Sequence, residues 1–274
     1  MAKTFLLAGF MAFAFHLSAK AQTRSYPGYE TFFGGLAAQV RYNPAIDDLG
    51  SRQQDFPYLV TITIFFDEID QTGKMVPENR ALIDKEEARF VKDVSQVSKG
   101  LYGGSFEYLG DYNLYFYVAD TSGVRNIAPL LSRFGMDLNE IDIRYDRQWS
   151  NYYNFLMPTA TDRLRMENQK QIETLIADGD DIYSPRAVTH DMYFEHEVNR
   201  KIFIKEAKKL DFEVVFLFES DNKDFPAGVS IVRFDPVEPG RVEEMTLQLY
   251  SLCHSLDGVY LGWSTEPVLQ LAEE

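Results

Sequence analysis

The second half of the chain shows the most regular pattern of apolar and polar positions. Apolar residues recur every three or four positions from Val198 to Ala207 and again from Val242 to Leu256, which is the spacing of amphipathic helices. With the strand-like segments around them, they predict the order β-α-β-β-α-β of a ferredoxin-like module. The segment 212–219 is apolar on both faces at its centre, so we expect it to be a central strand. The four predicted strands span 186–194, 212–219, 229–234 and 259–265.

The first half predicts the same order of elements after an opening strand at 36–42. Its clearest strand is 58–66, in which Val60 and Ile62 point one way and Thr61 points the other. This period of two indicates a sheet with one face in the core. The further predicted elements are a helix from Pro77 to before Gly100, a hairpin of 105–110 and 112–118, a helix over 124–134 that Gly135 stops, and a strand at 141–149.

A polar segment, 158–171, separates the two halves and leads into a linking helix through Ile172 and Ile176. We therefore expect an α+β protein of two tandem ferredoxin-like modules joined by a helical linker, with domains at 22–160 and 161–274. Helices cover one face of the sheet in such a module. The two remaining faces must therefore cover each other, or one of them must serve as a docking surface.

The N-terminus has the composition of a secretory signal peptide. Lys3 precedes an apolar run at 4–17, and a small-residue cleavage pattern precedes Gln22. We expect residues 1–21 to be removed and the protein to be exported, to the periplasm in a bacterium. The run is shorter than the roughly 20 residues that a membrane helix needs, so we expect no membrane span. The alternative is a buried N-terminal helix in a cytoplasmic protein.

The net charge of the chain limits the classes of molecule that it is expected to bind. The formal net charge is -15, which repels phosphate backbones, so we expect no direct binding to nucleic acid. A basic protein partner is electrostatically favoured, although acidity also serves simple solubility. Cys253 is the single cysteine, which rules out an internal disulfide and a cysteine metal cluster. It falls in an apolar helical pattern and is expected in the core.

Familiar catalytic and metal-binding motifs are incomplete. His196 and Glu197 begin an HExxH zinc motif, but Arg200 stands where its second histidine belongs. Asp180 and its neighbours at 178–181 resemble the start of a calcium loop that lacks the final glutamate, and we expect an exposed turn there. We therefore assign no catalytic residue, metal ligand or cofactor site.

One enzymatic alternative stays open. His190, Asp191 and Glu195 lie close together in the sequence and are the residues that an exported hydrolase or metal-binding protein would use. Successive residues of a strand point to opposite faces, so nothing in the pattern forces these side chains to converge.

A family resemblance gives the second half a functional direction. The segments 172–181, 188–190 and 260–265, which read IETLIADGDD, VTH and YLGWST, resemble the family regulator of ribonuclease activity B, over about residues 163–270. The resemblance implies a ferredoxin-like, acidic, non-catalytic domain that inhibits ribonuclease E by binding it. The family has an aspartate where this chain has Leu261, which bears on any contact made through that position.

The first half resembles the domain-of-unknown-function family 695. The segments that carry this resemblance are 57–66, Gly73 with Pro77, 108–110, Tyr115 to Tyr117, and 149–158, within about residues 27–160. The resemblance supports the domain boundary and implies nothing about function.

These observations favour a non-catalytic regulatory protein that binds another protein. Because ribonuclease E is cytoplasmic, an exported chain would need another target, whereas an uncleaved chain could regulate ribonuclease E itself. Trp263 could contact a partner or anchor the last strand to its own domain. If Leu261 is buried and Trp263 packs under the last helix, the motif is a signature of the fold. The candidate partner-binding residues are Tyr260, Gly262, Trp263, Thr265 and His190.

Overall fold

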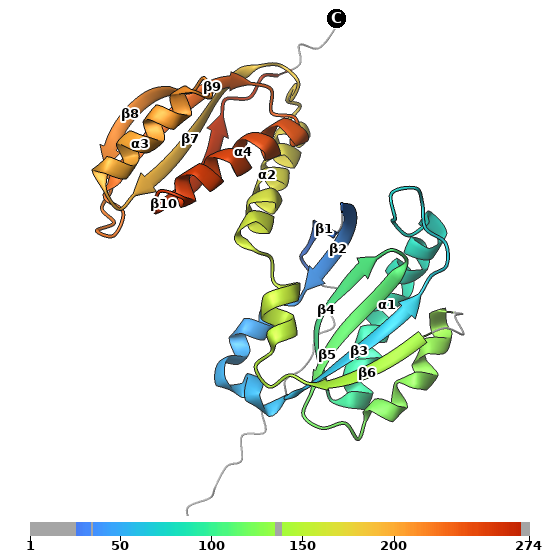
Figure 1. Ribbon diagram of the computed structural model, residues 1–274. Helices are drawn as coiled ribbons and strands as arrows, with labels where there is room; N and C mark the ends of the chain where they lie inside the picture. The colour runs from blue at the N-terminus through green and yellow to red at the C-terminus, as the bar shows by residue number, and fades with distance from the viewer. Residues whose placement is uncertain (1–25, 34, 135–138, 270–274) are drawn as a thin grey trace, which may run out of the picture.

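The computed structural model describes residues 26–33, 35–134 and 139–269. It shows a mixed α+β protein with two antiparallel sheets, one in each half of the chain (Figure 1). The expected signal peptide, 1–21, lies outside the described residues. Within the described ranges, no helix combines the length and the apolar character that crossing a membrane requires.

The first sheet has the strand order β1-β2-β4-β5-β3-β6, and every neighbouring pair is antiparallel. Helix α1 (Pro77–Ser98) packs on one face, where Ile83, Phe90 and Val94 join side chains of the central strands in a buried cluster. The strands are β1 (Gly28–Phe33), β2 (Leu36–Tyr42), β3 (Tyr58–Phe65), β4 (Leu101–Tyr108), β5 (Asp111–Val118) and β6 (Asn139–Tyr145).

The opposite face of this sheet is covered by its own chain over β2 and β5. The covering segments are η1 (Pro44–Asp55) and η4 (Tyr152–Leu156). Trp149 stacks on Tyr117 with ring centroids 3.6 Å apart, and its indole N–H donates to the carbonyl of Gln53. The first sheet therefore does not use the second sheet as its cover.

Three elements of the first half differ from the prediction. The strand expected at 141–149 ends at Tyr145, and Trp149 belongs to the segment that covers the sheet. The expected helix over 124–134 is a pair of short 3-10 segments, η2 (Val124–Asn126) and η3 (Ala128–Phe134). Pro129 lies inside this stretch and has no backbone N–H to donate, which disfavours a continuous α-helix. Strand β1 was not predicted, because its side chains are mostly partly exposed and show no clear alternation.

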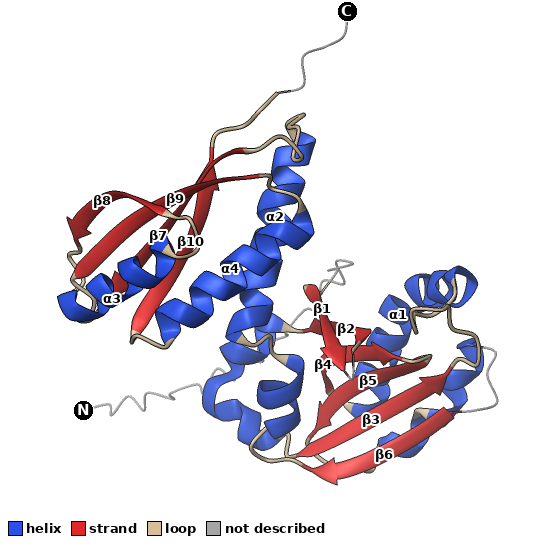
Figure 2. Cartoon of the chain, turned by 45° about the horizontal axis from the view of Figure 1, so that its top comes forward, coloured by secondary structure: helices blue, strands red, loops and turns tan. Residues whose placement is uncertain are grey.

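Helix α2 (Ala160–Ala177) includes most of the polar segment that was expected as the boundary. It begins with a capping box, in which the side chains of Thr159 and Asp162 bond each other's backbone N–H. Ile172 and Leu175 enter the core of the second half. The linking helix thus packs as part of the second unit, beside α4 (Pro239–His254), as Figures 1 and 2 show.

The second unit has the predicted order of elements. Its sheet has the strand order β10-β7-β9-β8. Helices α3 and α4 lie on the same face of it (Figure 1), and the core between helices and sheet includes Phe203, Met245 and Leu249. The remaining elements are β7 (Arg186–Phe194), α3 (Glu197–Lys208), β8 (Glu213–Glu219), β9 (Ala227–Asp235) and β10 (Gly258–Thr265).

The prediction of a central position for 212–219 is wrong. Strand β8 is an edge strand that pairs with β9 alone. Its apolar residues Val215, Phe216 and Leu217 are each more than half exposed. The apolar run lies on an open sheet edge, where β9 pairs with it on one side and α3 contacts it from one face.

Candidate functional site

The motif on β10 that was predicted to bind a partner is largely occupied with internal contacts. Trp263 is 8% exposed and belongs to the apolar core of the second unit. Its indole N–H donates to the side-chain oxygen of Asn168 on α2, at 2.9 Å. The amide of Asn168 in turn donates to the hydroxyl of Thr246 on α4, at 2.7 Å. Trp263 therefore anchors β10 to two helices of its own unit.

His190 and Tyr260 form a pair inside the same unit. His190 is fully buried, and its Nδ1 lies 2.8 Å from the hydroxyl of Tyr260. The ring of Phe212 meets His190 edge to face. The Nε2 atom of His190 has no hydrogen-bond partner among the described residues. The buried side chain of His190 is therefore positioned to organise the core, and it does not reach the surface.

We expect His190 to make the second unit less stable in acid. Burial, together with the charge of Arg233, lowers the pKa of His190 from 6.5 to about 3. The unfolded chain binds this proton near pH 6.5 and the folded chain only near pH 3. Stability is therefore complete above pH 6.5 and is lost as the pH falls below it. The loss is at most roughly 1.4 kcal/mol per pH unit, and urea unfolding between pH 7 and pH 5 measures it.

The matched variants are His190→Gln, which cannot take up the proton, and His196→Gln, which changes an exposed histidine. The first should remove part of the pH dependence of the free energy of unfolding, whereas the second should not. Equal pH dependence in the wild type and His190→Gln would contradict the assignment.

Gly262 and Thr265 complete the predicted motif. A bulge leaves Leu261 as an extra residue between Tyr260 and Gly262, and Gly262 has a φ of +122°. Open space surrounds the position of a Cβ on Gly262, so the backbone conformation alone favours glycine there. Thr265 donates to the carbonyl of Ala187. Trp263 is buried, as expected if the motif serves the fold alone, but Leu261 is 49% exposed. The motif is therefore not explained by the fold alone.

The second sheet has one face that no element covers among the described residues, and we call it the open face. The register pairs Tyr193 with Gly228 and Gly228 with Phe218, so these three residues share the face. The ring of Phe218 lies over Gly228, where a Cβ would come within 2.5 Å of it, and 5.3 Å from the ring of Tyr193. The other residues that the register places on this face are Ala187, Thr189, Asp191, Glu213, Phe216, Ser230, Val232, Phe234, Val259, Gly262 and Ser264.

Large apolar side chains on the open face are solvent-exposed. Phe234 is 74% exposed, Phe216 is 53% exposed, and Val259 also counts among the exposed apolar residues. Phe216 packs against Phe218, with ring centroids 5.4 Å apart. Single exposed apolar residues are common, but a group of aromatic side chains on one uncovered sheet face is typical of a surface that binds a partner.

Asp191 lies near the centre of the open face. Its neighbours across the sheet are Ser230 on β9 and Gly262 on β10. The carboxylate makes no hydrogen bond or ion pair within the described part of the chain, although it is partly buried. The hydroxyl of Ser230 beside it is fully buried and likewise has no partner there. The open face thus combines aromatic side chains with two unpaired polar groups.

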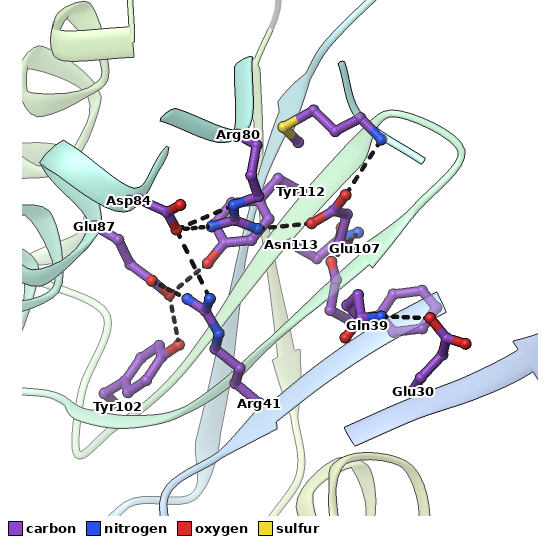
Figure 3. A network of polar contacts seen from close by, with 12 residues as sticks. Glu30, Gln39, Arg41, Arg80, Asp84, Glu87, Tyr102, Glu107, Tyr112 and Asn113 are labelled. Atoms are coloured by element: carbon purple, nitrogen blue, oxygen red, sulfur yellow. Dashed lines mark hydrogen bonds and ion pairs between the residues drawn. The ribbon is translucent and has the colours of Figure 1, made fainter. Parts of the chain in front are cut away.

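A second group of polar side chains lies in the first unit, where α1 meets β2, β4 and β5 (Figure 3). Glu87 accepts hydrogen bonds from Arg41 and from the hydroxyls of Tyr102 and Tyr112. Burial, and next the charge of Glu87, raises the pKa of Tyr112 far above its ordinary value.

A cavity of about 270 Å³ adjoins this network. Glu107, which lines it, pairs with Arg80 at 2.8 Å and also accepts from the backbone N–H of Met75. Lys74 pairs with Glu30 at 2.7 Å. Because the charges around the cavity are already paired with one another, the network fastens α1 to the sheet and leaves no free charge directed at a ligand.

Another cavity, of about 350 Å³, lies between β1 and α2 at the junction of the two units. Tyr29, Phe32, Met166 and Ile176 supply apolar surface, and Arg165 on its wall is paired with Glu243. Its other polar side chains include Glu30, which pairs with Lys74, and Glu173, which accepts from Gln169, so these groups are occupied within the chain.

The residues of the enzymatic alternative do not converge. His190 points into the core, whereas Asp191 lies on the open face, as strand alternation requires. Glu195 is exposed and lies beside His196, at 3.6 Å. The described residues also contain no group of three or more histidine, cysteine or acidic side chains that could hold a metal ion. The geometry gives no support to a catalytic or metal site in this region.

Comparison with known families confirms the prediction for the second unit. Residues 165–265 match the model of the family regulator of ribonuclease activity B. The matched segment runs from α2 to the end of β10 and includes the open face. The match supports a regulator-like, non-catalytic role for this part of the chain.

Other comparisons add little. A search of curated proteins gave no match. Three solved chains match. One is the crystal structure of an unknown protein from Galdieria sulphuraria, with 11% identity, covering 77% of this chain and 98% of that chain, at a TM-score of 0.20. A TM-score this low carries no conclusion about fold or function.

Proposed function

We propose that the second unit is a non-catalytic regulatory module that binds another protein through its open face. The observation that carries this proposal is the uncovered aromatic surface of Phe216, Phe218 and Phe234 within the segment that matches a family of regulators. In the second unit the helices cover one face of the sheet. Aromatic side chains that are exposed on the other face are not needed for folding. Such side chains are the usual anchors of protein interfaces.

Ribonuclease E is the first partner to test, because the family that the second unit resembles regulates a ribonuclease. Leu261 bears on which protein is bound and does not change the surface that binds it. It stands in place of the family's aspartate, is exposed, and lies in the bulge opposite Asp191, so the acidic group in this row of the sheet is Asp191. The binding surface would then have its acidic group on β7, at Asp191, and not on β10.

The two units supply the scaffold for this role. We propose that both are variants of the ferredoxin-like fold. In the second unit the strand order is β10-β7-β9-β8, and in the first the strands β4-β5-β3-β6 have the corresponding order, with β1 and β2 added at one edge. The assignment of the first unit to domain-of-unknown-function family 695 stays part of this proposal.

Export remains the second part of the proposal. The composition of residues 1–21 supports a cleaved signal peptide. In an exported protein the open face would bind a target other than ribonuclease E. Retention in the cytoplasm would leave ribonuclease E as the target.

We expect the full chain to slow RNA cleavage by purified ribonuclease E, and Phe234→Ser to weaken this effect about tenfold, as removal of an interface anchor does. Phe234 is 74% exposed, so its replacement should leave the fold intact. The measurement is the initial rate of cleavage of a fluorescent RNA as the concentration of the chain increases.

Tyr183→Ser is the matched control, because Tyr183 is an equally exposed aromatic residue of the same unit outside the open face. It should inhibit as the wild type does. An unchanged cleavage rate with the wild-type chain would exclude ribonuclease E as the target. Equal inhibition by the wild type and Phe234→Ser would show that the open face is not the binding surface.

A further inference from the structure

We infer that the open face binds a protein segment that presents an arginine, whose guanidinium pairs with Asp191 while flanking apolar side chains pack on the aromatic residues. This inference rests on the proposed function and specifies the chemistry of the partner. It starts from the charges of the face. Asp191 and Glu213 are its two ionisable acids, and the residues that form it include no lysine or arginine.

Asp191 is available for such a contact. Strand β9 carries an arginine, Arg233, but its side chain lies on the other side of the sheet. There it stacks over Phe212 at 4.4 Å, donates to the carbonyl of Leu210 and pairs with Asp235. The carboxylate of Asp191 is left without a counter-ion in the described structure. A partly buried carboxylate gains most from a partner that brings both charge and hydrogen-bond donors.

The surroundings of Asp191 fit a guanidinium better than an ammonium. Its neighbours Ser230 and Gly262 are small, which leaves room above the sheet, and no atom lies within 4 Å of the Cβ position of Gly262. Tyr193 lies two residues along the same strand, and Phe216 lies beyond Ser230 on β8. A planar guanidinium can bond a carboxylate through two parallel N–H groups while it lies flat on an aromatic ring, whereas a lysine ammonium has no planar group and binds as a point charge.

A second copy of the chain is a poorer occupant than a basic segment. A two-fold contact through the open face would bring Asp191 and Glu213 of one copy toward the same residues of the other. Each copy also carries a formal net charge of -15, so self-association is opposed at long range as well. The same charge attracts a basic segment and increases its rate of association.

The test begins by selecting binders of the full chain from a library of random twelve-residue peptides. The tightest peptide is then titrated by calorimetry, as is its analogue with citrulline in place of arginine. Citrulline keeps the shape of the side chain and removes its charge. The expected results are enrichment of arginine between apolar residues and about tenfold weaker binding of the citrulline analogue.

Two variants test whether the weaker binding of the citrulline analogue is due to Asp191. With Asp191→Asn the two peptides should bind within about twofold of each other, as a coupling between the two groups requires. Asp48→Asn is the matched control, because it makes the same chemical change at an exposed position of the first unit. With it the tenfold difference should persist, and this difference should shrink as salt is added.

The outcomes separate the inference from the proposed function. If Phe234→Ser abolishes binding and Asp191→Asn leaves the preference for arginine unchanged, the open face is a docking surface and the arginine inference is wrong. Selected peptides that bind Phe234→Ser as well as the wild type would overturn both. Sedimentation that shows a dimer of the wild type and a monomer of Phe234→Ser would overturn the inference, because the occupant would be a second copy.

Discussion

Trp263→Ala is expected to destabilise the second unit by about 3–5 kcal/mol, the usual cost of removing a buried tryptophan. The substitution leaves a cavity between β10 and the helices. It also removes the hydrogen bond to Asn168, whose side chain then remains buried without that donor. Unfolding in urea, followed by circular dichroism, should show an early transition for the second unit. Trp149 becomes the single tryptophan of the variant, and its fluorescence reports on the first unit separately.

Two further variants test the reason for this loss. Trp263→Phe keeps most of the buried apolar surface and loses the N–H donor, so it should cost less than Trp263→Ala. Leu261→Ala changes a neighbouring residue that is 49% exposed, and we expect a change within about 0.5 kcal/mol. If Trp263→Ala unfolds together with the wild type, Trp263 is not the anchor that the contacts indicate.

The order of elements in the second unit could be predicted from sequence, because local pattern and final structure agree over most of it. Helix α3 is an exception, since Val198 and Ile202, which the pattern places inward, are exposed. Strand 186–194 alternates strictly, and its buried residues Val188 and Met192 face the helices. In α4, the apolar residues that recur every three or four positions, such as Val242, Met245 and Leu249, are the ones that are buried. In the first unit, the apolar pattern is weaker around Pro129 and along the partly exposed strand β1. Neither element was predicted correctly.

Burial of individual groups was harder to predict, because it depends on contacts between distant segments. The apolar run at β8 is consistent with a central strand and also with an edge strand that has an exposed binding face. The strand order distinguishes these two possibilities. His190 and Asp191 are adjacent in sequence, yet one lies in the core and the other on the open face. The alternation of the strand indicates this separation. It does not indicate which face the helices will cover.

The turn that follows α2 shows the same limit. Asp180 was expected in an exposed turn, and that expectation is wrong. Its side chain is fully buried and pairs with Arg186 at 2.6 Å. It also accepts from the backbone N–H of Val268, which comes from the far end of the unit. The composition of an acidic turn cannot reveal a partner that approaches from 88 residues away.

Arg186→Met should therefore be as damaging as the loss of Trp263, at about 3–5 kcal/mol, because it leaves the charge of Asp180 buried without its counter-ion. Arg186 is itself buried and also donates to the carbonyls of Asp181 and Ser184, so the substitution removes several hydrogen bonds of the turn. Urea unfolding of the second unit measures the loss, and protease sensitivity near Val268 should increase with it.

The double variant Asp180→Leu with Arg186→Met distinguishes the buried charge from the packing. Removing both ions leaves no unpaired charge, so the double variant should be more stable than Arg186→Met alone, by a coupling of about 1–3 kcal/mol. Lys209→Met is the control for an exposed pair, since Lys209 and Glu206 both keep contact with solvent and their pairing should contribute less than about 1 kcal/mol. A double variant less stable than Arg186→Met would mean that the loss in Arg186→Met is not the cost of an unpaired buried carboxylate. The ion pair would then stabilise this turn through its geometry and hydrogen bonds.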